Sequence, residues 1–411
     1  MAFPTGLRAL NHRDFRLFWT GQLVSLVGTW MQSIGQSWLV LELTNSPLKL
    51  GLISTLQFGP MLFFSFPAGA IADRVPKRRL ILATQTALML QAFSLSVLAW
   101  TGQVQYWHVA VLAGLYGLAT TLDMPTRQSF IVEMVGKPDL MNAIALNSAM
   151  FNGARVVGPA VAGLLVARYG VAIAFLLNGV SFVAVILALL AIRNEGLPQD
   201  RGGTSVLQDI TAGVRYAVGT PLVSLILSLL LFVSLFVINH NVLVPLLARD
   251  VLHEGAHGFG LLMAALGTGA VAGALALAML GSGRPRLVVV VTAAIILSAV
   301  TLSLTIVRHF RAAAIALALI GFSQIVFLAS CNSTLQVTVP DTLRGRMMSI
   351  YAFVFVGVTP IGSFLVGSIA EFVGVPAAFA AGGGLGLLCV LGLTLWWTRS
   401  PAKKSLDFTW F

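Results

Sequence analysis

The sequence predicts an all-α membrane protein, and three observations lead to that fold class. Hydrophobic residues make up 57% of the 411 residues and charged residues only 9%, whereas soluble domains are about 25% charged. Apolar runs long enough to cross a bilayer recur from one end of the chain to the other. Lysine and arginine gather in the polar segments between these runs, as expected of loops retained in the cytoplasm.

The apolar runs predict twelve transmembrane helices. They cover residues 15–43, 48–72, 79–101, 105–127, 140–168, 170–192, 221–247, 257–281, 285–307, 311–338, 344–373 and 375–398. If the chain starts inside, 19 of its 25 lysines and arginines fall on the inner side and 5 on the outer side. Because cytoplasmic loops carry the excess of positive charge, this asymmetry predicts that both termini are cytoplasmic.

The longest polar stretch, residues 193–220, divides the chain into two halves of six helices. We expect an amino-terminal half at 1–192, a cytoplasmic central linker at 193–220, a carboxy-terminal half at 221–398 and a cytoplasmic tail at 399–411. Within the linker, residues 205–216 form either an amphipathic helix on the inner membrane surface or plain connecting chain. The spacing from Pro138 to Pro159 recurs, to within one residue, from Pro340 to Pro360, which indicates two pseudo-symmetric bundles.

Several functional classes are excluded by composition. The net charge of +11 does not indicate nucleic-acid binding, because the cations lie in loops between apolar runs. Cys331 and Cys389 fall inside apolar runs, so we expect neither a disulfide framework nor a metal site. The sequence has no phosphate-binding loop, zinc-protease pattern or nucleophile elbow. We therefore expect no catalytic residues and no cofactor. Residues 1–11 read as a short cytoplasmic tail without a cleavage site.

The loop after the second apolar run carries four cations within six residues. Its pattern consists of Gly69, Asp73, Arg74, Lys77 and Arg78. This pattern resembles the loop signature that joins helices 2 and 3 in the major facilitator superfamily. The resemblance implies a conformational latch, in which the Asp-Arg pair binds the inner end of helix 11 near residues 342–346 and favours the state closed to the cytoplasm. The alternatives are an ordinary positively charged anchor and a solvated pair. The second copy, near residues 273–286, has Leu277 at the Asp position, so we expect a one-sided latch.

The fifth apolar run carries a second resemblance. Gly153, Gly158, Pro159 and Gly163 are similar to the helix-5 antiporter motif of the same superfamily. Small residues allow close helix approach and proline bends the helix, and the resemblance implies an exporter. Arg155, within this motif, is the one cation placed well inside a predicted span, which makes it a candidate to bind an anionic substrate. The alternative is a structural pair within the amino-terminal half.

Polar side chains inside the spans predict a substrate cavity. The first helix carries Gln22, Ser25, Thr29, Gln32 and Gln36 at spacings of three and four residues, which places them on one face. Helix 1 lines the central cavity in the resembling superfamily. The cavity candidates are Gln32, Gln36, Asn147, Arg155, Asn239, Asn241, Gln324 and Asn332. The alternative role for such residues is hydrogen bonding between helices.

Proton coupling requires a group that can load and release a proton inside the membrane. The candidates are Glu42, Asp123 and His240. The helix-4 arginine of drug–proton antiporters has no counterpart here: if Gly117 is the motif glycine, Ala113 occupies the arginine position. Asp123 and Arg127 lie four residues apart and can also simply pair along the helix.

The segment at residues 123–128, together with residues 43–47, resembles bacterial exporters of the enterobactin-exporter and multidrug-efflux type. We therefore predict a monomeric secondary transporter in the bacterial inner membrane. Its partners would be lipid, protons and a small amphipathic substrate, either a siderophore or a drug-like compound, exported by proton antiport and alternating access. The alternatives are nutrient uptake by symport, which the Gly158-Pro159 motif disfavours, a transporter-like receptor, and a lipid enzyme, for which the chain lacks a clustered acid–base set.

Overall fold

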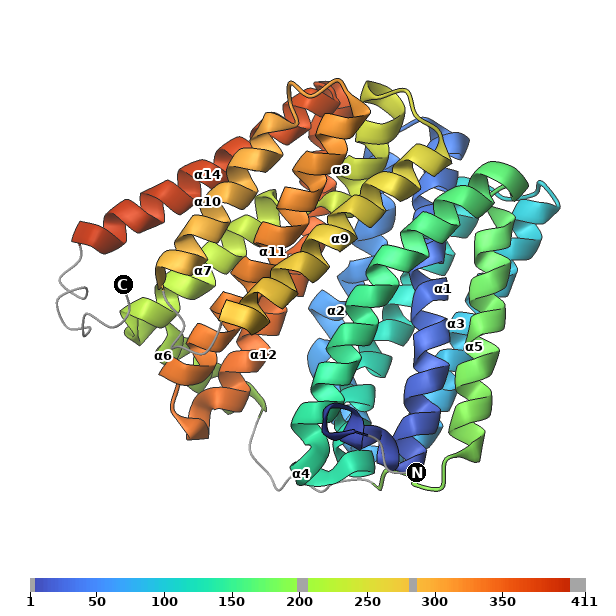
Figure 1. The fold of residues 1–411 in the computed structure, drawn as a ribbon, viewed down its shortest axis with the longest axis vertical. Coiled ribbons are helices and arrows are strands. Elements are labelled where there is room, and N and C mark those ends of the chain that lie inside the picture. Colours follow the sequence, from blue (N-terminus) through green and yellow to red (C-terminus); the bar gives the residue numbers. More distant parts are fainter. Residues whose placement is uncertain (1–3, 198–205, 281–286, 400–411) are drawn as a thin grey trace. The chain divides into compact units, whose positions relative to one another are not determined.

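The computed structural model describes residues 4–197, 206–280 and 287–399, and every regular element in these ranges is a helix (Figure 1). Nine helical segments of this described part are long and apolar enough to cross a membrane. The all-α membrane class is thus confirmed, while the count of twelve spans stays a prediction. Most of the predicted tail, the middle of the predicted linker and the end of the degenerate second loop lie outside the described residues.

The chain divides into two compact units. Unit 1 consists of Met1–Asn45, Leu56–Gly202 and Gly255–Ala264, and unit 2 of Ser46–Thr55, Gly203–Glu254 and Ala265–Phe411. Two helices therefore contribute to both units, α2 (Pro47–Arg74) and α9 (Ala256–Leu280). The first nine residues of each helix pack within one unit, and the remainder packs within the other. The domain boundaries predicted from the sequence stay a prediction.

Unit 1 is built on tight packing between its first and last long helices. Besides most of α2, it contains η1 (Thr5–Asn11), α1 (Arg13–Thr44), α3 (Lys77–Trp100), α4 (Tyr106–Tyr169) and α5 (Ala172–Ala191). Helices α1 and α3 each pack on both α4 and α5. Gly21, Gly28 and Gly35, seven residues apart on α1, face α5, where a β-carbon would lie 2.5–3.2 Å from its atoms. Small residues at this spacing let the two backbones approach closely.

Helix α4 differs from the sequence prediction of two helices separated by a loop. It runs from Tyr106 to Tyr169, and Gly136, with φ of 68°, is its one non-helical residue. The intervening segment is apolar, and Phe130 and Met134 belong to the buried core of unit 1. Burial of this segment favours a helix, and a glycine with positive φ makes the bend. Helix α4 is thus two long helical legs joined at Gly136.

The amino-terminal segment is also more ordered than the predicted tail. It forms the 3-10 helix η1, which docks on α4 just beyond the Gly136 bend. The Arg8 guanidinium lies 2.6 Å from the Asp139 carboxylate, and the Asn142 side chain accepts a hydrogen bond of 2.9 Å from the Ala9 amide. Ala9 is fully buried in the unit 1 core. This segment is therefore part of the folded unit.

Unit 2 contains the remaining helices. They are α6 (Val206–Gly219), α7 (Pro221–Phe236), α8 (His240–Leu246), the π-helix η2 (Leu247–Val251), α10 (Leu287–Ser303), α11 (Phe310–Thr338), α12 (Asp341–Gly357), α13 (Thr359–Phe372) and α14 (Val375–Arg399), with most of α9. Helix α10 packs on α11 and α14, and α7 packs on α12, α13 and α14. Helix α6 occupies the part of the linker for which the sequence left helix or plain chain open; it packs on α12.

Two predicted spans of unit 2 are each interrupted. The run at 221–247 breaks at residues 237–239, between α7 and α8, and the run at 344–373 breaks at Val358, between α12 and α13. Pro360 lies in the first turn of α13, where its missing amide hydrogen does not cost a helical bond. At the other break, the Asn239 side chain donates a hydrogen bond of 2.9 Å to the Leu235 carbonyl. The amide side chain thereby satisfies a carbonyl that the break leaves open.

Candidate functional site

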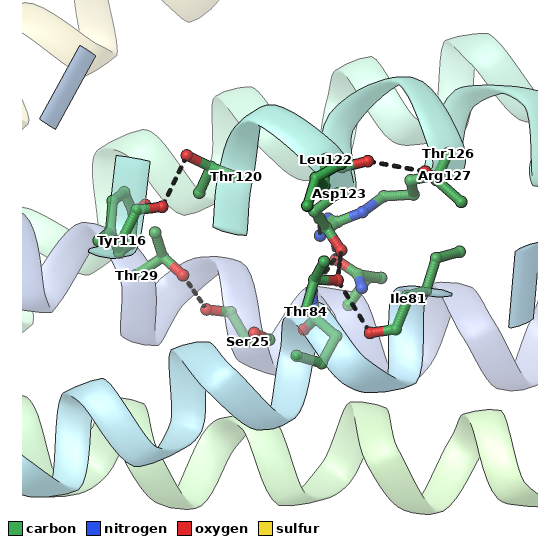
Figure 2. Close-up of polar contacts among 12 residues, drawn as sticks. Ser25, Thr29, Ile81, Thr84, Tyr116, Thr120, Leu122, Asp123, Thr126 and Arg127 are labelled. Carbon is green, nitrogen blue, oxygen red and sulfur yellow. Dashed lines mark hydrogen bonds and ion pairs between the residues drawn. The ribbon is translucent and has the colours of Figure 1, made fainter. Parts of the chain in front are cut away.

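A buried carboxylate in unit 1 is the centre of the candidate site. Asp123 lies on the first leg of α4 and is only 4% exposed. From α3, the Thr84 hydroxyl donates a hydrogen bond of 2.8 Å and the Gln85 amide one of 2.9 Å to the same carboxylate oxygen. Figure 2 shows Asp123 and Thr84 pointing toward each other across the α3–α4 contact. An isolated carboxylate is costly at such a depth, and these donors offset part of the cost.

Arg127 completes this cluster from the next turn of α4. Its guanidinium is paired with the other oxygen of Asp123, and it also donates a hydrogen bond to the Gln22 side chain on α1. The pairing along the helix that the sequence offered as one reading of these two residues is therefore present. Because Gln22 belongs to α1, the cluster links α1, α3 and α4 through one acid–base pair. We call Gln22, Thr84, Gln85, Asp123 and Arg127 the Asp123 cluster.

Two cations of the loop signature are bound within unit 1. Lys77 is 1% exposed, and its ammonium lies 2.7 Å from the Glu133 carboxylate on α4 and 2.9 Å from the Leu197 carbonyl. Arg78 donates hydrogen bonds to the Leu189 and Leu190 carbonyls at the end of α5. These two residues fix the start of α3 to its neighbours, which an ordinary solvated anchor would not do.

The other residues of the loop signature lie at the end of α2. Gly69 and Asp73 are half-buried, and Arg74 is exposed as the last residue of the helix. Their predicted role as a latch stays a prediction.

The helix-5 motif lies on the second leg of α4 and contacts two different helices. A β-carbon at Gly158 would lie 2.5 Å from the Trp30 side chain on α1. A β-carbon at Gly163 would lie 2.9–3.1 Å from the backbone of α9 around Gly260, and the Pro159 carbonyl faces the same glycine. Gly153, by contrast, has nothing within 4 Å of that position. The motif therefore brings α4 into backbone contact with the first residues of α9, all within unit 1.

Arg155 lies on the same leg of α4, three residues before Gly158. Its guanidinium carbon is 5.9 Å from the centre of the Trp30 ring, within the range of a cation–π contact. The Trp30 ring in turn meets Phe151 edge-on at 5.8 Å. The side chain is half-buried. Its predicted role in binding an anionic substrate stays a prediction.

The polar face of α1 is engaged in hydrogen bonds between helices. Gln32, 3% exposed, donates a hydrogen bond of 2.9 Å to Gln91 on α3 and accepts one of 2.7 Å from Asn178 on α5. Gln36 lies 3.5 Å from Gln57 on α2. These contacts match the role that the sequence offered as the alternative to substrate binding. As substrate contacts, Gln32 and Gln36 stay predictions.

The remaining predicted positions are spread over both units. In unit 2, Asn239 is 2% exposed beside the α7–α8 break and His240 begins α8. In the same unit, Gln324 is buried in α11, and Asn241 and Asn332 are half-buried. In unit 1, Asn147 is half-buried on α4, and Glu42 is exposed near the end of α1, where it accepts a hydrogen bond of 2.7 Å from Trp38. Asn147 and Glu42, which share unit 1 with the Asp123 cluster, are not members of that cluster.

Sequence reasoning missed several partners that build the site. Thr84 and Gln85 are adjacent polar residues inside an apolar run, and Asn178 is the amide in the very apolar helix α5. A polar side chain inside a span needs a partner, because hydrocarbon offers none. Each of these residues by itself therefore predicts a hydrogen-bond partner. The sequence does not show which helix supplies that partner.

Comparison with known proteins places the chain among membrane exporters. A family model described as transmembrane secretion effector matches residues 4–409. The multidrug efflux pump Tap of Mycolicibacterium fortuitum is 28% identical over 87% of this chain and 90% of its own length. The staphyloferrin A transporter of Staphylococcus aureus is 26% identical over 91% of this chain and 94% of its own length. The enterobactin exporter of Salmonella typhimurium is 28% identical over 94% of this chain and 92% of its own length.

Solved structures show the same fold. The crystal structure of the nucleoside transporter NupG superposes with a TM-score of 0.75 at 11% identity, covering 95% of this chain and 99% of that one. A bacterial homologue of the human lysosomal transporter Spinster, inward-facing and unoccupied, gives a TM-score of 0.69 at 12% identity, with coverage of 93% and 94%. At these identities the likeness concerns the fold alone. It confirms the fold that the loop signature and the apolar pattern predicted.

Proposed function

The chain belongs to the transmembrane secretion effector family of the major facilitator superfamily, and from this premise we propose a specific transport reaction. The protein is an export transporter of the kind its relatives represent. Its substrate is a small amphipathic molecule of the siderophore or drug-like class. It works as a monomer in the bacterial inner membrane, with both termini in the cytoplasm, as the distribution of positive charge favours. Export is driven by proton entry through alternating access.

The observation that carries the proton step is the Asp123 cluster. In the state of the structure, Arg127 holds the Asp123 carboxylate, and both are bound to α1 and α3 through Gln22 and Thr84. A proton that binds Asp123 removes its charge and weakens the attraction of Arg127. Arg127 then keeps its contact with Gln22 on α1, while α4 loses an ionic contact along its own length. Proton loading in this way leaves the Arg127 cation held by α1 through Gln22 and no longer by the charge on its own helix.

The remaining ionisable candidates are less suited to this role. Glu42 is exposed near one end of α1 and accepts a hydrogen bond from Trp38 on its own helix. His240 belongs to unit 2, whereas the acid–base pair belongs to unit 1. Asp123 is the most buried of the three and has donors from two helices and a cation within reach. We therefore assign it the proton.

The test is proton movement in inside-out membrane vesicles whose interior is acidified. A pH-sensitive dye reports the gradient while candidate compounds, including catecholate siderophores, are added. We expect substrate-dependent loss of the gradient with the natural protein and none with Asp123→Asn, in which the single amide oxygen still accepts from Thr84. Glu254→Gln, on the loop before α9, is the matched control and keeps the activity.

Each alternative outcome is distinct. Labelled substrate that crosses equally well in both variants without proton movement would exclude Asp123 and the proton as the coupling elements. Accumulation of substrate in right-side-out vesicles would show uptake and overturn the export direction.

A further inference from the structure

The start of α2 has an incomplete helix cap in its own sequence. Ser46 precedes the helix, and its hydroxyl oxygen accepts a hydrogen bond of 3.2 Å from the Lys49 amide. A serine in this position is commonly paired with a Glu or Gln three residues later, whose side chain completes the cap. Here that position is Lys49, which has no acceptor to offer. A carboxylate is therefore missing from the sequence around this helix end.

Glu371, near the end of α13, supplies the carboxylate. The Ser46 hydroxyl donates a hydrogen bond of 2.7 Å to one oxygen of Glu371, and the Leu48 amide donates one of 3.1 Å to the same oxygen. The two partners are 325 residues apart in the sequence. A negative charge at a helix amino terminus is stabilised both by the free amides and by the helix dipole. The first turn of α2 is thus capped by another helix.

Below this cap, α2 and α13 meet almost backbone to backbone. A β-carbon at Gly51 would lie 2.5 Å from the Ser363 carbonyl, and one at Gly367 would lie 2.9 Å from the Pro47 carbonyl. One turn further along, the Thr55 hydroxyl donates a hydrogen bond of 2.9 Å to the Pro360 carbonyl. We call this contact, residues 46–55 with residues 360–371, the α2–α13 seam. Small residues give it a close fit.

The seam coincides with the place where α2 changes compact unit. Ser46–Thr55 belong to unit 2 with α13, while α2 from Leu56 onward belongs to unit 1. The Gln57 carbonyl already faces Gly117 on α4 of unit 1. A continuous helix held by two units has to leave one of them, or bend, when the units move. The α2–α13 seam is therefore one of the contacts at which α2 can part from a unit during the transport cycle.

We propose that Glu371 is the latch of this seam, holding the amino end of α2 on α13 through a cap supplied from another helix. The inference rests on the proposed transport by alternating access and adds a positioning residue to it. Release of Glu371 leaves the Leu48 amide in the first turn of α2 without this acceptor, so opening of the seam and loss of the carboxylate from the cap are one event. Glu371 is exposed, so water replaces the lost partners and keeps the step reversible.

The experiment measures how readily the seam opens. Ser54 is 6% exposed and lies within the segment of α2 that belongs to unit 2. Ser54→Cys is introduced into a chain in which Cys331 and Cys389 are replaced by alanine. The labelling rate with a membrane-impermeant maleimide is then measured in right-side-out vesicles. We expect slow labelling with Glu371 present and labelling about tenfold faster in Glu371→Ala, which removes the charged acceptor of the hydrogen bonds from Ser46 and Leu48.

Two further variants separate the latch from a merely stabilised helix end. Glu254→Ala, another carboxylate of unit 2, is the matched control and keeps slow labelling. Ser46→Asp combined with Glu371→Ala restores a carboxylate cap to α2 from its own sequence, so that the cap no longer binds α13. The latch requires fast labelling in this double variant. Slow labelling there, or an unchanged rate in Glu371→Ala, would overturn the proposal. No transport substrate is needed, so failure to find one would count against the proposed function without deciding the latch.

Discussion

At the scale of single residues, the Asp123 cluster shows how far sequence reasoning reaches. The spacing of Asp123 and Arg127 predicted their pairing, because residues four apart share a helical face. The bond from Arg127 to Gln22 and the bonds from Thr84 and Gln85 depend on which helices become neighbours. A single sequence contains no signal for that choice. The pair was therefore predictable, and the network that surrounds it was not.

The network also predicts how the pair responds to substitution. Arg127→Leu leaves the Asp123 carboxylate buried with Thr84 and Gln85 as donors but without its cation. Breaking a buried ion pair from one side costs about 3–5 kcal/mol, so we expect a clear loss of thermal stability in detergent. Asp123→Asn combined with Arg127→Leu removes the stranded charge and should recover most of that loss.

The measurement for this prediction is the midpoint of thermal unfolding in detergent. Size-exclusion chromatography of samples heated to increasing temperatures monitors the fraction that stays folded. Equal destabilisation in the single and the double variant would mean that Arg127 stabilises the fold through packing and Gln22 alone. The comparison thus separates the charge of the pair from the size of its side chains.

At the scale of elements, the sequence located the apolar segments well and their interruptions poorly. The predicted run at 221–247 corresponds to α7, α8 and η2, and that at 344–373 to α12 and α13. Both runs were predicted as single helices because hydropathy does not register a short break in an apolar segment. At α4, the sequence left residues 128–139 between two predicted spans, and the structure has two helical legs that meet directly at Gly136. Burial of neighbouring side chains decided that case.

The helix-5 motif yields a matched pair of substitutions within one element. Gly163→Val places side-chain atoms against the backbone of α9, which cannot yield as a flexible side chain would. Gly153→Val introduces the same residue into the same leg of α4 at a position with open space. We expect the first variant to lose transport in the vesicle assay and the second to retain most of it.

Both valine variants change the helix propensity by the same amount, a gain of a few tenths of a kcal/mol because valine favours a helix more than glycine does. A difference between them therefore reports the α4–α9 contact. Equal activity would mean that the close approach of Gly163 to Gly260 is not required during the cycle, and the motif would then have no special role at its last glycine.

At the scale of the whole molecule, α2 is the element that gives the latch proposals a common test. Its first residues carry the cap from Glu371, and its last residues are Asp73 and Arg74 of the loop signature. The next residues of that loop, Lys77 and Arg78, are bound to α4 and α5 within unit 1. We infer a division of labour, in which Lys77 and Arg78 fix the loop and Asp73 takes part in switching. Lys77→Met should then lower stability, whereas Asp73→Asn should alter transport in a protein that still folds.

Substitutions at the two ends of α2 should have opposite effects on the labelling of Ser54→Cys. The loop signature implies that Asp73 favours the state closed to the cytoplasm, and Glu371 holds the opposite end of the helix on α13. Removing the Asp73 charge therefore favours a closed seam, and removing Glu371 favours an open one. In the Ser54→Cys background, we expect Asp73→Asn to slow maleimide labelling and Glu371→Ala to speed it.

Combining the two changes should give a labelling rate between those of the two single variants, because each change shifts the same two-state equilibrium in the opposite direction. If Asp73→Asn instead accelerates labelling, or leaves the Glu371→Ala rate unaltered in the double variant, the two ends of α2 act on separate equilibria. The contacts at the two ends of α2 would then be independent of each other, and the roles of Asp73 and Glu371 would have to be established separately.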